Sequence, residues 1–225
     1  MNPLSMLYHR TRLLLNTLLG TRFNELIWRF RHIYRRGWAE GLITSASHPH
    51  RKLLAERISL HAPFRDVLEI GCATGPNLYV LAKTFPNVRY VGIDINPSAI
   101  KQGKIFFEKE KINNVSLLTA KADALRFSDK SFDIVFTDAV LMYIGPDKIM
   151  QVTEEIQRIA RKAIVLVEHH SGEESPIGVN MGKWWLRNYV KLFQPYIRQA
   201  RCTKITSDVW GGNWSRFGYI IEMEK

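Results

Sequence analysis

The sequence predicts an α/β domain built on a parallel sheet, and three observations support that prediction. After Pro63, short apolar runs alternate with amphipathic helical patterns. Such alternation produces right-handed βαβ units, whose helices cover both faces of a parallel sheet. The length of 225 residues suits one domain with a short extension. Hydrophobic residues make up 46% and charged residues 24% of the chain, which excludes a disordered, collagenous or coiled-coil protein.

The part of the chain before Pro63 is predicted to be helical. Apolar residues recur at helical spacing from Phe23 onward, and arginines surround that stripe. Gly37 is a suitable stop for this helix. The predicted elements are helices at residues 3–19, 23–36 and 51–60, with a loop at residues 41–50.

The part after Pro63 is predicted to supply the sheet. Its expected strands are the apolar runs at residues 67–70, 88–93, 115–118, 132–137 and 163–167. Its expected helices cover residues 77–85, 97–111 and 147–160, and Pro97 opens the second of them. Two further strands, at about residues 201–206 and 216–222, are close enough in sequence to form an antiparallel hairpin on one sheet edge.

Basic residues are concentrated in the two flanks of the chain, whose net charge is +11. Residues 1–62 hold 10 basic and 3 acidic residues, residues 63–175 hold 14 and 15, and residues 176–225 hold 8 and 3. All six tryptophans also lie in the flanks. We therefore predict two parts, a basic helical extension or lid at residues 1–62 and the main domain at residues 63–225.

Several protein classes are excluded by what the sequence lacks. No apolar stretch approaches the roughly 18 residues of a membrane-spanning helix. Two cysteines cannot form a disulfide framework or a zinc cage by themselves. No secretory signal is convincing, so we expect a cytoplasmic protein, with peripheral contact at the inner membrane surface left open.

Polar residues follow the first two predicted strands where a ligand site is expected. Open parallel sheets bind ligands at the carboxyl ends of their strands. Gly71 and Gly75, four residues apart, allow a sharp turn and a close approach of ligand to main chain. Asp94 ends the second strand, where a carboxylate accepts hydrogen bonds from ribose hydroxyls. The alternative role of Asp94, as a helix cap, is better filled by Asn96.

The next two strands carry further candidates. Asp123 follows the third strand and is either an acceptor for the exocyclic amine of a base or an exposed turn residue. Asp138 lies just past the fourth strand and faces the expected crevice. A nicotinamide-dependent dehydrogenase is disfavoured, because Gly71-Cys72-Ala73-Thr74-Gly75-Pro76 does not fit its Gly-x-Gly-x-x-Gly fingerprint.

Four motifs, taken in order, resemble those of the class I S-adenosylmethionine-dependent methyltransferases. They are Val-Leu-Glu-Ile-Gly-Cys-Ala-Thr-Gly, Gly-Ile-Asp-Ile-Asn, Ala-Asp-Ala and Phe-Asp-Ile-Val-Phe-Thr-Asp. The resemblance covers residues 64–170. It implies a Rossmann-like, seven-stranded, mostly parallel sheet with an antiparallel last strand, and S-adenosylmethionine as cofactor. The cofactor-binding positions that it implies are Glu69, Gly71, Cys72, Ala73, Gly75, Asn77, Asp94, Ile95, Ala122, Asp123, Ala124 and Asp138. Ala73 stands where the family usually has glycine, and a positive φ there would weaken cofactor binding.

Three residues are candidates for a general base, which methyl transfer needs only when the acceptor must lose a proton. His169 and His170 follow the fifth strand, and Tyr143 follows the fourth. The alternative for both histidines is a surface or core position. A metal site built from them is not predicted, because Glu168 and Asp138 complete the set at poor spacing.

The resemblance implies methyl transfer to a small-molecule, sugar- or lipid-linked acceptor, with an oxygen atom as the favoured target. A catalytically inactive cofactor-binding or scaffold protein is an alternative, and so is an RNA or protein methyltransferase that uses the basic flanks. No nucleic-acid-binding module is visible. The basic N-terminal helices are expected to form a lid, to lie on an anionic membrane or to bind a polyanion. Aromatic residues at helical spacing, from Trp184 and Trp185 to Tyr189 and Phe193, predict a second cover over the substrate.

Overall fold

In the computed structural model, residues 3–31, 37, 41 and 43–225 are described. A seven-stranded sheet runs through the domain in the order β3-β2-β1-β4-β5-β9-β8. Its strands are β1 (Asp66–Ile70), β2 (Arg89–Asp94), β3 (Val115–Thr119), β4 (Phe132–Asp138), β5 (Ala160–His169), β8 (Gln199–Lys204) and β9 (Gly218–Glu224). The first five are parallel, and β9 pairs antiparallel with both β5 and β8. The predicted sheet and its terminal hairpin are therefore confirmed.

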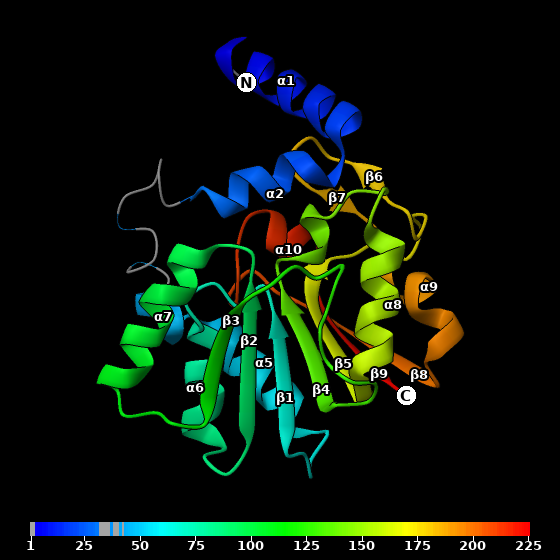
Figure 1. The fold of residues 1–225 in the computed structure, drawn as a ribbon. Helices are drawn as coiled ribbons and strands as arrows, with labels where there is room; N and C mark the ends of the chain where they lie inside the picture. The colour runs from blue at the N-terminus through cyan, green and yellow to red at the C-terminus, as the bar shows by residue number, and fades with distance from the viewer. Residues whose placement is uncertain (1–2, 32–36, 38–40, 42) are drawn as a thin grey trace.

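Helices cover both faces of the sheet, as Figure 1 shows. The longer helices are α1 (Pro3–Leu19), α2 (Thr21–Arg29), α5 (Pro49–Ser59), α6 (Pro76–Thr84), α7 (Pro97–Lys109) and α8 (Ile149–Ile159). The short ones are η1 (Ser45–Ser47), η2 (Leu141–Tyr143), α9 (Tyr189–Phe193), η3 (Gln194–Tyr196) and α10 (Asn213–Phe217). One core layer lies between the sheet and α5, α6 and α7, and the other lies between the sheet and α8 and α9. Strand alternation sends Val67 into the first layer and Leu68 into the second.

Helix α5 belongs to the core, although it precedes the predicted domain boundary at residue 62. Its side chains Leu54, Ala55 and Ile58 are buried in the same cluster as Leu78 of α6. Helices α1 and α2 lie instead at the carboxyl end of the parallel strands (Figure 1). No helix among the described residues is both long enough and apolar enough to cross a bilayer.

Two local predictions were wrong or incomplete. The predicted aromatic helix is instead a hairpin of β6 (Val179–Asn180) and β7 (Trp185–Leu186), followed by α9. Gly178 and Gly182 precede the aromatic segment and take positive φ of 94° and 84°, and Gly182 lies in the turn between β6 and β7. The predicted loop at residues 41–50 includes η1 and the start of α5, and residues 32–36 of the predicted second helix lie outside the described residues.

Candidate active site

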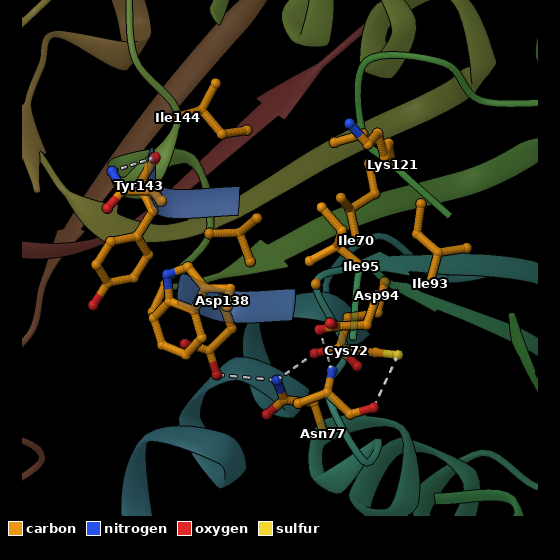
Figure 2. Close-up of a pocket in the computed structure, with 18 of the residues that line it drawn as sticks. Ile70, Cys72, Asn77, Ile93, Asp94, Ile95, Lys121, Asp138, Tyr143 and Ile144 are labelled. Atoms are coloured by element: carbon orange, nitrogen blue, oxygen red, sulfur yellow. Dashed lines mark hydrogen bonds between the residues drawn. The ribbon is translucent and has the colours of Figure 1, made fainter. Parts of the chain in front are cut away.

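A cavity of about 460 Å³ opens at the carboxyl ends of β1, β2 and β4. This is the switch point of the sheet, since β2 and β4 lie on opposite sides of β1. Figure 2 shows side chains from all three strand ends converging on it, among them Ile70, Asp94 and Asp138. Helix α2 forms the opposite wall through residues Thr21, Asn24, Glu25 and Trp28.

The glycine turn after β1 forms the floor of the cavity. Gly71 has a φ of 76°, and a Cβ built there would lie 2.2 Å from Cγ2 of Val140. Only glycine fits this position, because the backbone of Gly71 packs directly against the turn after β4. Ala73 has a φ of 50°, so its backbone lies in the left-handed region that favours glycine.

Asp94 fixes the glycine turn and faces the cavity. Its Oδ2 atom accepts a hydrogen bond from the Ala73 amide at 2.8 Å, and its Oδ1 atom accepts one from the Asn96 amide at 2.8 Å. Burial raises the pKa of Asp94, while its backbone hydrogen bonds act in the opposite direction. Each carboxylate oxygen retains a second lone pair, which suits it to accept from two neighbouring hydroxyls.

Two buried carboxylates lie beside the turn and share one amide. The Asn77 Nδ2 atom donates to Glu69 Oε1 at 2.7 Å and to Asp138 Oδ2 at 3.0 Å, as Figure 2 shows for Asp138. The remaining oxygens, Glu69 Oε2 and Asp138 Oδ1, are buried without a hydrogen-bond partner. Burial raises the pKa of Glu69 to about 8. Burial also opposes charge on Asp138, but its contacts with His50, Arg51 and Asn77 hold its pKa below the usual value.

A histidine pair reaches the same carboxylate from the start of α5. The Nε2 atom of His50 lies 3.0 Å from Asp138 Oδ2, and its Nδ1 atom lies 2.6 Å from Nδ1 of His48. The His50 ring stacks on Trp210 with centroids 4.1 Å apart. Burial lowers the pKa of His48, and the neighbouring His50 and Arg51 lower it further. Both histidines line the cavity.

The sequence analysis does not predict this histidine pair, because the composition of residues 41–50 is typical of a loop. The available signal was His48-Pro49-His50, in which Pro49 marks a helix start and two histidines flank it. Their proximity to Asp138 is a tertiary contact across 88 positions, which no local pattern predicts.

Helix α2 is fastened over the cavity by polar contacts. Glu25 forms ion pairs with Lys121 at 2.8 Å and with Lys148 at 2.5 Å. The Thr21 amide and hydroxyl donate to Asp147 Oδ1 at 2.9 and 2.7 Å. Further along, the Asn24 amide donates to the backbone oxygen of Tyr143, and the Asn96 amide donates to that of Trp28.

The predicted cofactor positions are largely gathered at this cavity. Its described wall includes Glu69, Gly71, Cys72, Ala73, Asn77, Asp94, Ile95, Ala122, Asp123 and Asp138. Gly75 and Ala124 are not among the described lining residues. The Asp123 carboxylate, expected to contact a base, pairs with Lys148 at 2.6 Å.

The three predicted catalytic residues are not brought together. Tyr143 lines the cavity, and burial raises its pKa. His169 and His170 are buried outside the described lining. The ring of His169 lies 4.3 Å from that of Trp184 and 4.4 Å from that of Trp214, and the His170 Nδ1 atom accepts from the Tyr189 amide. The His169 ring therefore packs among tryptophans, while the His170 ring packs against Tyr189 of α9 and Tyr219 of β9.

Between them and the cavity, Glu168 shapes the turn after β4. Its carboxylate accepts hydrogen bonds from the Thr137 hydroxyl and from the amides of Val140, Leu141 and Met142. Burial raises the pKa of Glu168 to about 7. This buried acceptor fixes the segment that presses Val140 against Gly71.

The comparisons with known proteins agree with the fold. Residues 65–218 match a family model described as a methyltransferase domain. The solved structure of an S-adenosylmethionine-dependent methyltransferase from Aquifex aeolicus has a TM-score of 0.60 at 16% identity, covering 81% of this chain and 96% of that chain. The chain belongs to the class I S-adenosylmethionine-dependent methyltransferases, and S-adenosylmethionine is the cofactor of this family.

Two curated relatives have named acceptors. A trans-aconitate 2-methyltransferase from Afipia carboxidovorans is 24% identical over 130 residues, which cover 58% of this chain and 47% of that protein. A fatty-acid O-methyltransferase from Mycolicibacterium smegmatis is 35% identical over 71 residues, 32% of this chain and 25% of that protein. The chain spans about half the length of these curated relatives, or less.

Proposed function

We propose that this chain transfers a methyl group from S-adenosylmethionine to an oxygen atom of a small-molecule acceptor. The observation that carries the proposal is the pair of buried, unpartnered oxygens, Glu69 Oε2 and Asp138 Oδ1, beside the glycine turn. Buried acceptors of this kind need a donor, and the ammonium group of the methionine portion supplies several. Asp94, at the end of β2, would accept from the ribose hydroxyls.

The chain's own residues would orient the reactants and move one proton. When bound, S-adenosylmethionine supplies a methyl group on a sulfonium, which is an excellent leaving group. Helix α2 excludes water from above, through Trp28 and its neighbours. We assign the general base to His48 in place of His169 and His170, because His48 lines the cavity.

The base role assigned to His48 requires its ring proton to lie on Nδ1. The Nε2 atom of His50 lies 3.0 Å from Asp138 Oδ2, and the Nδ1 atoms of the two histidines lie 2.6 Å apart. The His50 amide also donates to Nδ1 of His48 at 3.4 Å, a contact that this tautomer would give up. The Nε2 atom of His48 would then take the proton of an acceptor hydroxyl. A carboxylate acceptor would need no such step.

The finer identity of the acceptor is part of this proposal. The names of the two curated relatives specify organic acids as acceptors, trans-aconitate in one and a fatty acid in the other. A sugar- or lipid-linked acceptor is consistent with a cavity whose wall includes α2, and α1 and α2 would also provide peripheral contact with a membrane.

The experiment is calorimetric binding followed by a transfer assay. We expect the purified protein to bind S-adenosylmethionine and not NADH, and to move its labelled methyl group into low-mass compounds of a bacterial extract. Binding without transfer would favour the inactive scaffold, and label in RNA or protein would favour the alternative that uses the basic flanks. Binding of NADH alone would overturn the proposal.

A further inference from the structure

Helix α1 exposes apolar side chains to solvent and buries a polar one, the reverse of what a solvated surface helix normally does. Asn16 is 1% exposed and donates to the backbone oxygen of Gly182 at 2.6 Å. By contrast, Leu14 is 57% and Leu18 is 69% exposed. A solvated surface helix normally buries its apolar stripe and exposes its polar residues. Here polar contacts attach the inner face, and leucines cover the outer one.

Helix α2 repeats this arrangement over the cavity. Thr21, Asn24, Glu25 and Trp28, at positions i, i+3, i+4 and i+7, line the cavity. The opposite stripe consists of Arg22, Leu26, Arg29 and Phe30, all exposed. Together with Met6, Arg10, Leu13, Leu14 and Leu18 of α1, these four residues form what we name the outer face of the helical pair.

The outer face combines apolar side chains with positive charge. Its arginines are Arg10, Arg22 and Arg29, and the acidic residue of positions 1–31, Glu25, is turned inward to pair with Lys121 and Lys148. Apolar side chains interspersed with arginine are the composition of helices that lie in the interface of an anionic bilayer. A second copy of this chain would bring like charges together, which disfavours self-association through this face.

We propose that the outer face of α1 and α2 docks this protein on an anionic lipid bilayer, so that the methyl acceptor is reached from the membrane surface. The second clause rests on the proposed function; the docking itself does not. The cavity-lining residues and the exposed outer-face residues lie on opposite sides of one helix, α2. An amphiphilic acceptor could therefore enter the cavity along the edge of α2 while its apolar tail stays in the bilayer.

The test is co-sedimentation of the full chain with vesicles of phosphatidylcholine, with and without phosphatidylglycerol. We expect binding only when phosphatidylglycerol is present, with weakening at high salt. The double variant Leu14→Asp/Leu18→Asp should lower vesicle affinity by about tenfold or more, because binding scales with buried apolar area.

The matched control is the double variant Leu60→Asp/Ile105→Asp. These side chains are 60% and 50% exposed, lie outside the outer face and change the charge equally. It should bind vesicles nearly as the parent does. Equal losses in both variants, or no vesicle binding by the parent, would overturn docking through the outer face, and so would a dimer that only Leu14→Asp/Leu18→Asp dissociates.

Binding of S-adenosylhomocysteine, measured on the same samples, separates this inference from the proposed function. Vesicle binding with no cofactor binding would refute methyl transfer and leave the docking face standing. If every variant binds S-adenosylhomocysteine and none binds vesicles, the docking face is refuted and the proposed function stands.

Discussion

The Nε2 atom of His50 lies 3.0 Å from Oδ2 of Asp138, and through the other ring nitrogen His50 meets His48. This contact joins the start of α5 to the end of β4 and places two histidines in the cavity wall. It also makes one carboxylate a common partner of His50, Arg51 and Asn77. Any change at Asp138 would therefore disturb contacts with α5 and α6 at the same time.

Replacement of His48 tests its assigned role. We expect His48→Gln to lower kcat by about 100-fold or more with a hydroxyl acceptor, while affinity for S-adenosylhomocysteine stays within about twofold. His169→Gln is the matched control and should preserve both parameters, because His169 does not line the cavity. Equal loss of kcat in the two variants would contradict the assignment.

The pH profile offers a second check on His48. A base acts only when unprotonated, and burial with the adjacent His50 and Arg51 lowers the pKa of His48 from 6.5, while Asp138 opposes the shift. The rate should therefore stay constant down to about pH 6.5 and fall below it. A midpoint above 6.5, measured from kcat/KM against pH, would speak against His48.

Loss of the Asp94 carboxylate should weaken cofactor binding. Asp94→Ala removes the acceptor for ribose hydroxyls and also the partner of the Ala73 amide. We expect a 10- to 100-fold weaker Kd, which is about 1.5–3 kcal/mol, measured by calorimetry with S-adenosylhomocysteine. Asp66→Ala, at the opposite end of β1, serves as control and should leave the Kd unchanged. Unaltered affinity in Asp94→Ala would remove this residue from the ribose role.

The backbone of Ala73 is expected to limit stability. Its φ of 50° lies in the left-handed region, where a Cβ costs roughly 1 kcal/mol. Ala73→Gly should therefore raise the free energy of unfolding by up to about 1 kcal/mol, measured by urea denaturation. Ala82→Gly, within α6, should lower it by a similar amount. A lower stability for Ala73→Gly would show that the turn bears no such strain.

Acid should destabilise the fold through His169. Burial first, and then the charge of Lys204, lower its pKa from 6.5 to about 4. The contribution of the neutral ring is complete above pH 6.5 and is lost as the pH falls through 4, up to about 3 kcal/mol. In His169→Phe, unfolding free energies measured between pH 7 and 4 should decline less steeply than in the parent. An identical slope would exclude His169 as the cause.

The sheet and much of the candidate site could be predicted from the sequence, because each signal there is local. Glu69, Asp94 and Asp138 all stand at ends of apolar strands, and parallel topology brings such ends together. The His48–His50 pair could not be found in this way, since its position depends on how α5 packs. The spacing of the aromatic residues likewise gave a wrong prediction at Trp184 and Trp185, because strands and helices both accept these residues and Trp185 pairs with Asn180 in a hairpin.

Glu25 is the sole acidic residue in the first 39 positions of the chain, and it joins α2 to both Lys121 and Lys148. One substitution at Glu25 would therefore remove both of the ion pairs that hold α2 over the cavity. A change at this one side chain would loosen the cover of the cavity while leaving Glu69, Asp94 and Asp138 in place at the strand ends.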